Sequence, residues 1–320
     1  MSLPENSTAT REATATRVAL VTCAELPSLP EDDRPLVEQL RAGGIIAEPA
    51  VWDDPTVDWA GYHLAVLRST WDYLARREEF VAWAATVPRL ANPAQLVAWN
   101  TDKRYLVELD MVGVPVIPTS WFAPDDYWQP PVTGQWVVKP AVGAGSRDCG
   151  RYQLSDPEHR RLAVAHVARL QRADRLVMVQ PYLPAVDGYG ETALIFFADP
   201  DKGHLTYSHA IRKGPMLTGP DHPDDDLHRP EVITARVPSA AELAVARRAV
   251  AAIPAQPSRL LYARVDLIPG PDGRPLLVEL ELTEPSLFLS TDTGAARRLS
   301  AAIVASAAAR AVAGDRFVDQ

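Results

Sequence analysis

Three carboxylates near the end of the chain have the spacing of a cation site. Glu279 and Glu281 stand two residues apart in one apolar run, and Asp266 lies in the preceding run, beyond a turn at 269–273. Because strand residues two apart share a face, antiparallel pairing across this turn would bring Asp266 beside both glutamates. Unpaired carboxylates this close repel one another, and a ligand set of oxygens alone suits Mg²⁺ or Mn²⁺.

The alternative for these carboxylates is the solvated face of an exposed hairpin. It fits poorly, because the glutamates belong to a run rich in apolar residues: Leu276, Leu277, Val278, Leu280 and Leu282. Such a composition is typical of a largely buried strand. We therefore expect the carboxylates to hold metal, with Arg264 on the same strand as Asp266.

A run of small residues after Lys139 is a second candidate site. Gly143, Gly145 and Ser146 follow a predicted strand at 135–140, and their backbone N–H groups could approach a phosphate closely. The spacing matches neither a Walker loop nor a dinucleotide fingerprint. A glycine turn between two strands stays open as the alternative.

A third cluster follows the predicted strand at 63–68. It contains Arg68, Ser69, Thr70, Trp71, Asp72 and Tyr73, which together could bind both a carboxylate and an ammonium group. In doubly wound sheets, ligands bind beyond the carboxyl ends of the strands, where this cluster would lie. The alternative is a helix N-terminus capped by Thr70 or Asp72.

The elements that position these residues alternate at first between strands and helices. Apolar runs predict strands at 17–23, 45–52 and 63–68, and helical spacing predicts helices at 32–42 and 76–85. This alternation indicates a doubly wound α/β domain. Strands dominate afterwards, at 135–140, 176–183, 191–198, 206–212, 260–268 and 275–282, with a helix at 240–253.

The composition of the chain limits the classes of binding partner that we expect. The chain has 320 residues with 47% hydrophobic and 23% charged side chains, which is typical of a globular protein of about two folding units. Its net charge of −9 disfavours nucleic acid, and no apolar run is long enough to cross a membrane. Cys23 and Cys149 form no CxxC motif, which fits a reducing cytoplasm. The seven histidines lack zinc spacing, and a homo-oligomer stays open.

Several short motifs, taken in order, resemble the ATP-grasp superfamily. They comprise Lys103 after Asn100-Thr101-Asp102, Lys139 before the small-residue loop, Gln180-Pro181-Tyr182-Leu183 followed by Glu191, Lys213, Arg264-x-Asp266 and Glu279-x-Glu281. Glu281 departs from the pattern, because most members have Asn at that position. An acidic residue there keeps an oxygen ligand for the metal.

The resemblance implies a role for each matching residue. Lys103, Lys139 and the Gly143–Ser146 loop would hold ATP phosphates, the backbone of 180–183 would receive adenine, and Glu191 would bind ribose. Lys213 would reach the β- and γ-phosphates, while Arg264 would neutralise charge during phosphoryl transfer. Asp266, Glu279 and Glu281 would hold two Mg²⁺ ions. His209, before Arg212 and Lys213, either faces the phosphates or has a packing and hydrogen-bonding role.

Residues 1–16, rich in Ser, Thr and Ala, are predicted to form a disordered tail, and the prolines between Pro115 and Pro131 predict a domain boundary near residue 110. With the resemblance, this predicts an N-terminal domain at 17–110, a small subdomain at 111–190 and a subdomain with the metal site at 191–320. Residues 143–147 and the acidic loop 218–230 would act as lids. The expected reaction activates a small amino-acid-like carboxylate as an acyl phosphate, which a nitrogen nucleophile attacks.

A narrower resemblance is to the glutathione-synthetase-like branch. Residues 68–73, 208–213 and 279–287 are similar to cyclo-ligases that close O-ureido-serine into a five-membered ring in cycloserine biosynthesis. On this resemblance Arg68 to Tyr73, Glu284 and Ser286 would contact the substrate. Intermolecular ligation of amino acids is the alternative, and a nucleotide-binding module without turnover is a third hypothesis that the intact motif set disfavours.

Overall fold

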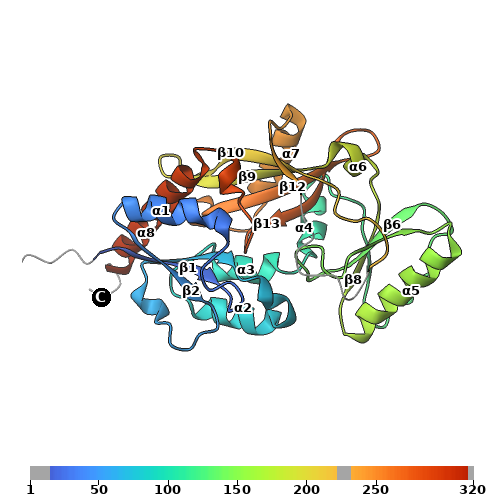
Figure 1. The fold of residues 1–320 in the computed structure, drawn as a ribbon, viewed down its shortest axis with the longest axis horizontal. Helices are drawn as coiled ribbons and strands as arrows, with labels where there is room; N and C mark the ends of the chain where they lie inside the picture. Colours follow the sequence, from blue (N-terminus) through green and yellow to red (C-terminus); the bar gives the residue numbers. More distant parts are fainter. Residues whose placement is uncertain (1–14, 222–231, 316–320) are drawn as a thin grey trace, which may run out of the picture.

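The computed structural model describes residues 15–221 and 232–315, which form three sheets flanked by helices (Figure 1). Most of the predicted tail and most of the acidic loop lie outside these residues. The mixed α/β class is as expected. None of the helices within the described ranges is long and apolar enough to cross a membrane.

The first sheet is parallel, with the strand order β2-β1-β3-β4. Its strands are β1 (Arg17–Thr22), β2 (Ile46–Val51), β3 (Leu64–Ser69) and β4 (Leu90–Ala91). Helices cover both faces, as expected for a doubly wound domain. On one face lie α1 (Arg34–Ala42) and α8 (Ala295–Asp315), and on the other lies α2 (Arg77–Thr86).

Alternating side chains of β1 explain this layering. Val18 and Leu20 belong to the apolar cluster that includes α1 and α8, whereas Ala19 and Val21 belong to the cluster that includes α2. Since all four residues are fully buried, each face of the strand is a core. Helix α8 thus returns from the end of the chain to complete the N-terminal domain.

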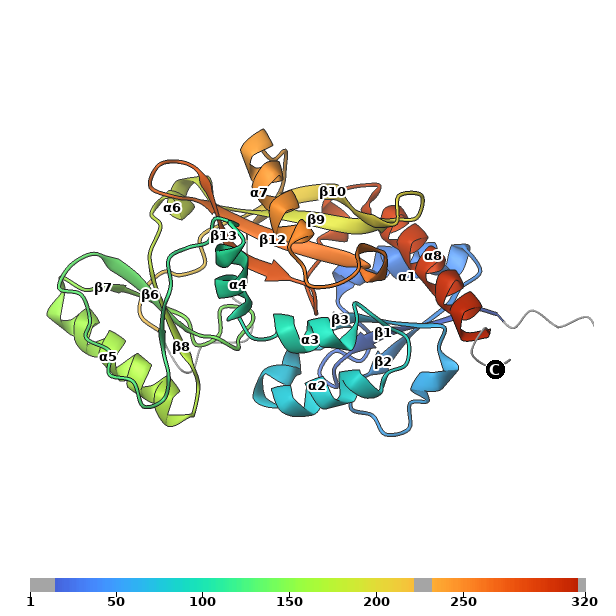
Figure 2. The same ribbon diagram turned by 180° about the vertical axis from the view of Figure 1, so that it is seen from behind.

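The second sheet is antiparallel and has the order β5-β8-β6-β7. Its strands are β5 (Ser120–Phe122), β6 (Gln135–Pro140), β7 (Gly150–Gln153) and β8 (Val177–Pro181), and α5 (Pro157–Arg172) packs on it. Asp156 caps α5 by accepting hydrogen bonds from the amides of Glu158 and His159. Helices α3 (Ala94–Asn100) and α4 (Tyr105–Met111) connect the first sheet to the second (Figure 2).

The third sheet has the order β11-β10-β9-β12-β13 and is also antiparallel. Its strands are β9 (Glu191–Asp199), β10 (His204–Lys213), β11 (Ile233–Arg236), β12 (Tyr262–Pro269) and β13 (Pro275–Glu281). Helix α7 (Ala240–Ala251) covers one face and begins with a capping box between Ser239 and Glu242. The short elements that remain are α6 (Ala185–Tyr189), η1 (Glu31–Asp33), η2 (Trp59–Gly61), η3 (Trp71–Ala75), η4 (Pro257–Arg259) and η5 (Leu289–Thr291).

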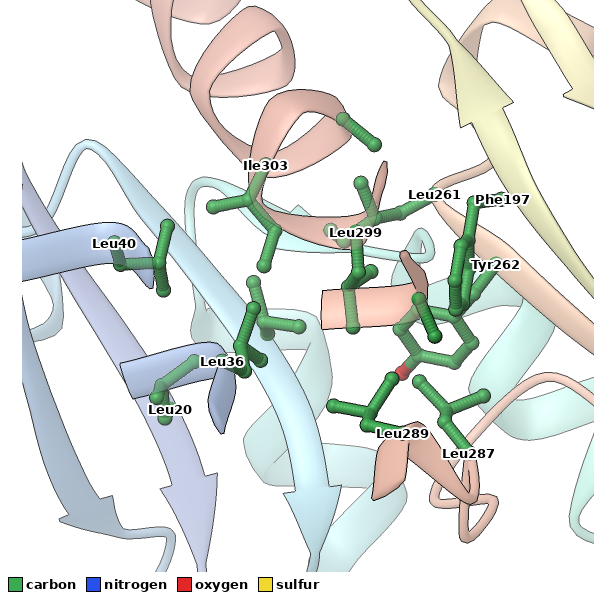
Figure 3. Packing of buried hydrophobic residues seen from close by; sticks show 14 of the residues in the cluster. Leu20, Leu36, Leu40, Phe197, Leu261, Tyr262, Leu287, Leu289, Leu299 and Ile303 are labelled. Carbon is green, nitrogen blue, oxygen red and sulfur yellow. The ribbon is translucent and has the colours of Figure 1, made fainter. Parts of the chain in front are cut away.

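The other face of the third sheet packs against the N-terminal domain. Figure 3 shows Phe197 and Tyr262 of this sheet in one cluster with Leu36 of α1 and Ile303 of α8. Removing a large buried side chain from such a cluster costs about 2–5 kcal/mol, because the cavity left behind closes only partly. The first and third sheets are therefore joined by an apolar core. The boundaries expected at 110 and 190 stay predictions.

Candidate active site

A cavity of about 550 Å³ is lined by residues of the second and third sheets and of connecting segments, including Trp71 and Leu74 of η3. It contains most of the predicted site residues: Trp71, Lys103, Lys139, Gly143, Gly145, Ser146, Gln180, Pro181, Tyr182, Leu183, Glu191, Lys213, Arg264, Asp266, Glu279, Glu281, Glu284 and Ser286. Five predicted residues are absent from its lining, namely Arg68, Ser69, Thr70, Asp72 and Tyr73. The ATP-side predictions thus converge in space, and most of the cluster after β3 does not.

The hairpin β12–β13 carries the charged centre of the cavity. Its strands are antiparallel, as predicted, with Asp266 paired to Glu279 and Arg264 paired to Glu281. The register then shifts, because Leu267 pairs with Leu277 and leaves Val278 as an extra residue. This bulge lets Val278 and Glu279 both line the cavity, although they are neighbours in a strand.

Two cations share the buried Asp266 carboxylate. It accepts hydrogen bonds from Arg264 Nη2 at 2.9 Å and Lys213 Nζ at 2.8 Å. Burial opposes ionisation of Asp266, but Arg264 and Lys213 more than offset it and hold its pKa well below the usual range. Arg264 also pairs with Glu281. Asp266 therefore stays ionised in the absence of metal.

Two other carboxylates of the cavity, Glu281 and Glu191, ionise less readily than usual. Burial raises the pKa of Glu281 to about 8 and that of Glu191 to about 7, although Arg264 and Lys213 respectively counteract the shift. Glu191 pairs with Lys213, and its contact with a ribose stays a prediction. Glu279 pairs with Lys103 at 2.9 Å.

Lys139 differs from the other cations of the site. It lines the cavity yet forms no ion pair with any residue that the structure describes. Burial lowers its pKa and Lys103 adds to the effect, while Glu279 opposes it. An anionic ligand would stabilise the charged form of this buried ammonium group, so the position of Lys139 suits a contact with phosphate.

The loop beside Lys139 has a backbone that favours small residues. Gly145 and Ser146 have φ values of +61° and +59°, in the left-handed region. Lys103 Nζ donates to the carbonyl of Gly143, so the loop is connected to the hairpin β12–β13 through Lys103 and Glu279. Further along, Asp148 is held by Arg169 at 2.8 Å and by Arg175.

The expected adenine side of the cavity is formed by the end of β8. The Tyr182 hydroxyl donates to Asp187 at 2.6 Å, and the guanidinium of Arg151 lies 3.6 Å from the centre of the Tyr182 ring. Gln180 donates to the Thr119 hydroxyl at 2.8 Å. These contacts fix an aromatic wall that could stack against a flat ring.

The cluster after β3 lies mostly outside the cavity. Val21 pairs with Leu67 and Thr22 with Ser69, so Arg68 sits on a bulge and turns to the η1 helix. There its Nη2 pairs with Asp33 at 2.8 Å, and both side chains are 2% exposed. Asp72 accepts from Trp52 and Arg76. Arg68 as a carboxylate-binding residue is thus not supported by its position.

The segment 282–287, which follows β13, explains where Arg68 acts. Each of its six carbonyl groups accepts a hydrogen bond from a side chain elsewhere in the molecule. In chain order the donors are Asn92, Tyr262, Trp71, Arg68, Arg264 and His209. His209 therefore has the hydrogen-bonding role, with Nε2 donating to Leu287 at 2.9 Å. Asn92 and Tyr262 were missed, because single polar residues at buried positions give no spacing signal.

The donor set fits a divalent metal, although the three carboxylates do not converge on one point. Their oxygens are not all within 4.8 Å of one another; in the described parts of the chain only Cys23, Glu25 and Asp72 meet that criterion. Arg264 forms ion pairs with both Asp266 and Glu281, and Lys103 forms an ion pair with Glu279. All three offer hard oxygen ligands that now balance cations, which is the ligand type Mg²⁺ requires.

Comparison with known proteins gives consistent relatives. A family model described as the N-terminal domain of D-cycloserine synthetase DcsG matches residues 18–92. The cycloserine biosynthesis protein DcsG of Streptomyces lavendulae is 41% identical over 305 residues, covering 89% of this chain and 97% of that protein. A crystal structure of D-cycloserine synthetase DcsG has 39% identity and a TM-score of 0.76, over 90% of this chain and 98% of the other. D-alanine–D-alanine ligase from Bacillus anthracis shares the fold, with 15% identity and a TM-score of 0.61 over 95% of this chain and all of that one.

Proposed function

The chain belongs to the family of the cycloserine biosynthesis protein DcsG, among the ATP-grasp ligases, and from that premise we propose that it closes a small amino-acid-like substrate into a ring. The enzyme forms a C–N bond at the expense of ATP. The substrate carboxylate is activated as an acyl phosphate, and a nitrogen of the same molecule attacks the carbonyl carbon and displaces phosphate. We take O-ureido-serine as the substrate to test.

One observation carries the proposal. A single cavity gathers three lysines, one buried arginine and the carboxylates of the hairpin β12–β13. Phosphoryl transfer requires positioning and charge neutralisation more than a covalent nucleophile, and this set supplies both. Lys139 and Lys103 would bind phosphate oxygens, Lys213 would reach the transferred group, and Arg264 would neutralise the charge that develops there.

Asp266, Glu279 and Glu281 would hold Mg²⁺. When bound, the metal supplies positive charge to the triphosphate, whose own negative charge would then take over the cations that the carboxylates pair with now. The lysines and Arg264 would exchange one anionic partner for another. We assign the reaction to the cytoplasm, where ATP is made available and where the two cysteines, both free thiols, stay reduced.

The test is ADP release with O-ureido-serine of each configuration, together with mass spectrometry of the product. A five-membered cyclic product supports ring closure. A linear amide formed only when a second amine is added would replace it with intermolecular ligation. If no amino acid of a broad panel stimulates ADP release, the chain is a nucleotide-binding module.

Glu279→Gln tests the metal assignment in the same assay. We expect kcat to fall at least about 10²-fold, because one preorganised electrostatic group is lost. Glu38→Gln, on an exposed position of α1, is the matched control. Near-normal ADP release by a folded Glu279→Gln protein would remove this residue from the metal site.

A further inference from the structure

The carboxylates that line the cavity differ in whether they pair with a cationic side chain. Among the described residues, Glu191, Asp266, Glu279 and Glu281 each pair with a lysine or an arginine. Glu284 also lines the cavity, yet it has no cationic partner in the same part of the structure. It is only 8% exposed, so water does little to compensate its charge.

The Glu284 side chain has a neutral neighbour in the N-terminal domain. This neighbour is the hydroxyl of Tyr73, in the middle of the η3 helix. The Tyr73 ring is itself held in place by stacking on Phe80, with ring centres 4.8 Å apart. Trp71 Nε1 donates to the main-chain carbonyl of Glu284 at 3.1 Å. The backbone of Glu284 is thus held in place, and its side chain lies beside a rigidly packed tyrosine, before any ligand binds.

A buried carboxylate without a cation, aimed at a cavity, suits a cationic ligand. The indole of Trp71 lines the cavity as well and offers an aromatic surface, which attracts alkylammonium ions. One carboxylate and one aromatic ring match a single positive charge of modest size.

We propose that Glu284, whose backbone is held by Trp71, binds the ammonium group of the amino-acid substrate. This inference rests on the proposed function, since it names how that ligase recognises its substrate. It places the ammonium at the N-terminal domain's side of the cavity. The cations Arg264 and Lys213 remain available to the phosphate that activates the substrate carboxylate.

The test compares O-ureido-serine with its analogue in which hydrogen replaces the amino group. For Glu284→Gln we expect the KM of the amino substrate to rise about 10- to 100-fold, the range of a charge-assisted hydrogen bond. The KM of the deaminated analogue, already weak in the wild type, and the KM of ATP should stay within about twofold. Tyr73→Phe should raise the amino-substrate KM less, about threefold to tenfold.

The outcomes separate this proposal from others. Equal rises for both substrates, or a rise in the KM of ATP, would overturn it and make Glu284 a structural or nucleotide-binding residue. If the wild type does not turn over O-ureido-serine, that substrate is wrong for the proposed function. The ammonium site is then judged by thermal shifts with ADP, comparing D- and L-alanine with D- and L-lactate. Stabilisation by alanine alone that is lost in Glu284→Gln supports it, and no difference within the pairs overturns it.

Discussion

Two buried arginines lie on either side of the 282–287 segment and make nearly the same contacts. Arg264, on β12, pairs with Asp266 at 2.9 Å and donates to the carbonyl of Ser286 at 3.1 Å. Arg68, on β3, pairs with Asp33 at 2.8 Å and donates to the carbonyl of Pro285 at 3.4 Å. Arg264 lines the cavity, whereas Arg68 does not.

The difference lies in what surrounds each pair. Arg264 has two carboxylate partners, Asp266 and Glu281, and an open side toward the cavity. Arg68 has one carboxylate partner and is enclosed by protein, so no ligand can share its charge. Residue type and ion pairing alone therefore do not identify a functional arginine. What identifies Arg264 is its position at a cavity, next to more than one carboxylate.

The largest effect is expected from breaking the enclosed ion pair between Arg68 and Asp33. Arg68→Met leaves Asp33 buried without its counter-ion, so we expect the free energy of unfolding to fall by about 3–5 kcal/mol. Urea denaturation measures this loss. The KM values for ATP and for the acid substrate should stay unchanged in the folded fraction.

The double variant Arg68→Met with Asp33→Leu is the control for that prediction. It removes both charges and should recover much of the lost stability, because no unpaired buried charge remains. A raised substrate KM in Arg68→Met without any loss of stability would return Arg68 to the substrate site.

The corresponding substitution of Arg264, whose ion pairs face the cavity, should lower the turnover rate. Arg264→Met removes the guanidinium that we propose contacts the phosphates, and we expect kcat to fall about 10²- to 10³-fold. ADP release measures it, with Arg259→Met at an exposed position as the control. If kcat changes less than tenfold while stability collapses, Arg264 resembles Arg68 and the contrast between the two is wrong.

Lys139 extends the comparison to a cation that forms no ion pair with the residues the structure describes. Lys139→Ala should raise the KM of ATP about tenfold or more, since one charge-assisted phosphate contact is lost. Lys202→Ala, on the exposed turn between β9 and β10, should leave it unchanged. Calorimetry with ATP measures the affinity directly, and equal values for the two variants would exclude Lys139 from the phosphate site.

His166 gives the smallest effect and tests an enclosed group in the second sheet's domain. Burial and the nearby Arg169 lower its pKa to about 4, although Asp148 opposes them. Between pH 6.5 and 4 the unfolded chain therefore binds a proton that the folded protein refuses. Acidification should lower the free energy of unfolding by at most about 1.4 kcal/mol per pH unit from this group. His166→Gln should flatten that slope in urea denaturation, and an unchanged slope would contradict the assignment.

The regular alternation of side chains along a strand made the pairing within the hairpin β12–β13 predictable from the sequence. An apolar run, a Pro- and Gly-containing turn and a second run suffice to pair Asp266 with Glu279, because strand geometry has a fixed period. The bulges at Arg68 and Val278 break that period and leave no mark in residue type. Arg68 was therefore expected at the substrate, when in fact its strand turns it toward Asp33.

Long-range contacts between buried polar groups also could not be predicted from the sequence. Tyr73 and Glu284 meet across more than half the chain, and nothing near either residue indicates the other. The ATP side was more accessible, because Lys103, Lys139 and Lys213 occur in a recognisable order. Their pairing with carboxylates, such as Lys213 with Glu191, depends on how the sheets pack and needed the structure.

The six carbonyl contacts of segment 282–287 bear on how this protein could acquire new substrates. Donors outside the segment hold its main chain, so the conformation does not depend on which side chains occupy positions 284 and 286. Natural drift or a laboratory library can exchange these two residues while the ATP-binding half and the course of the backbone stay constant. We expect saturation at 284 and 286 to yield mostly folded proteins, a ready starting point for ligases that accept other small acids.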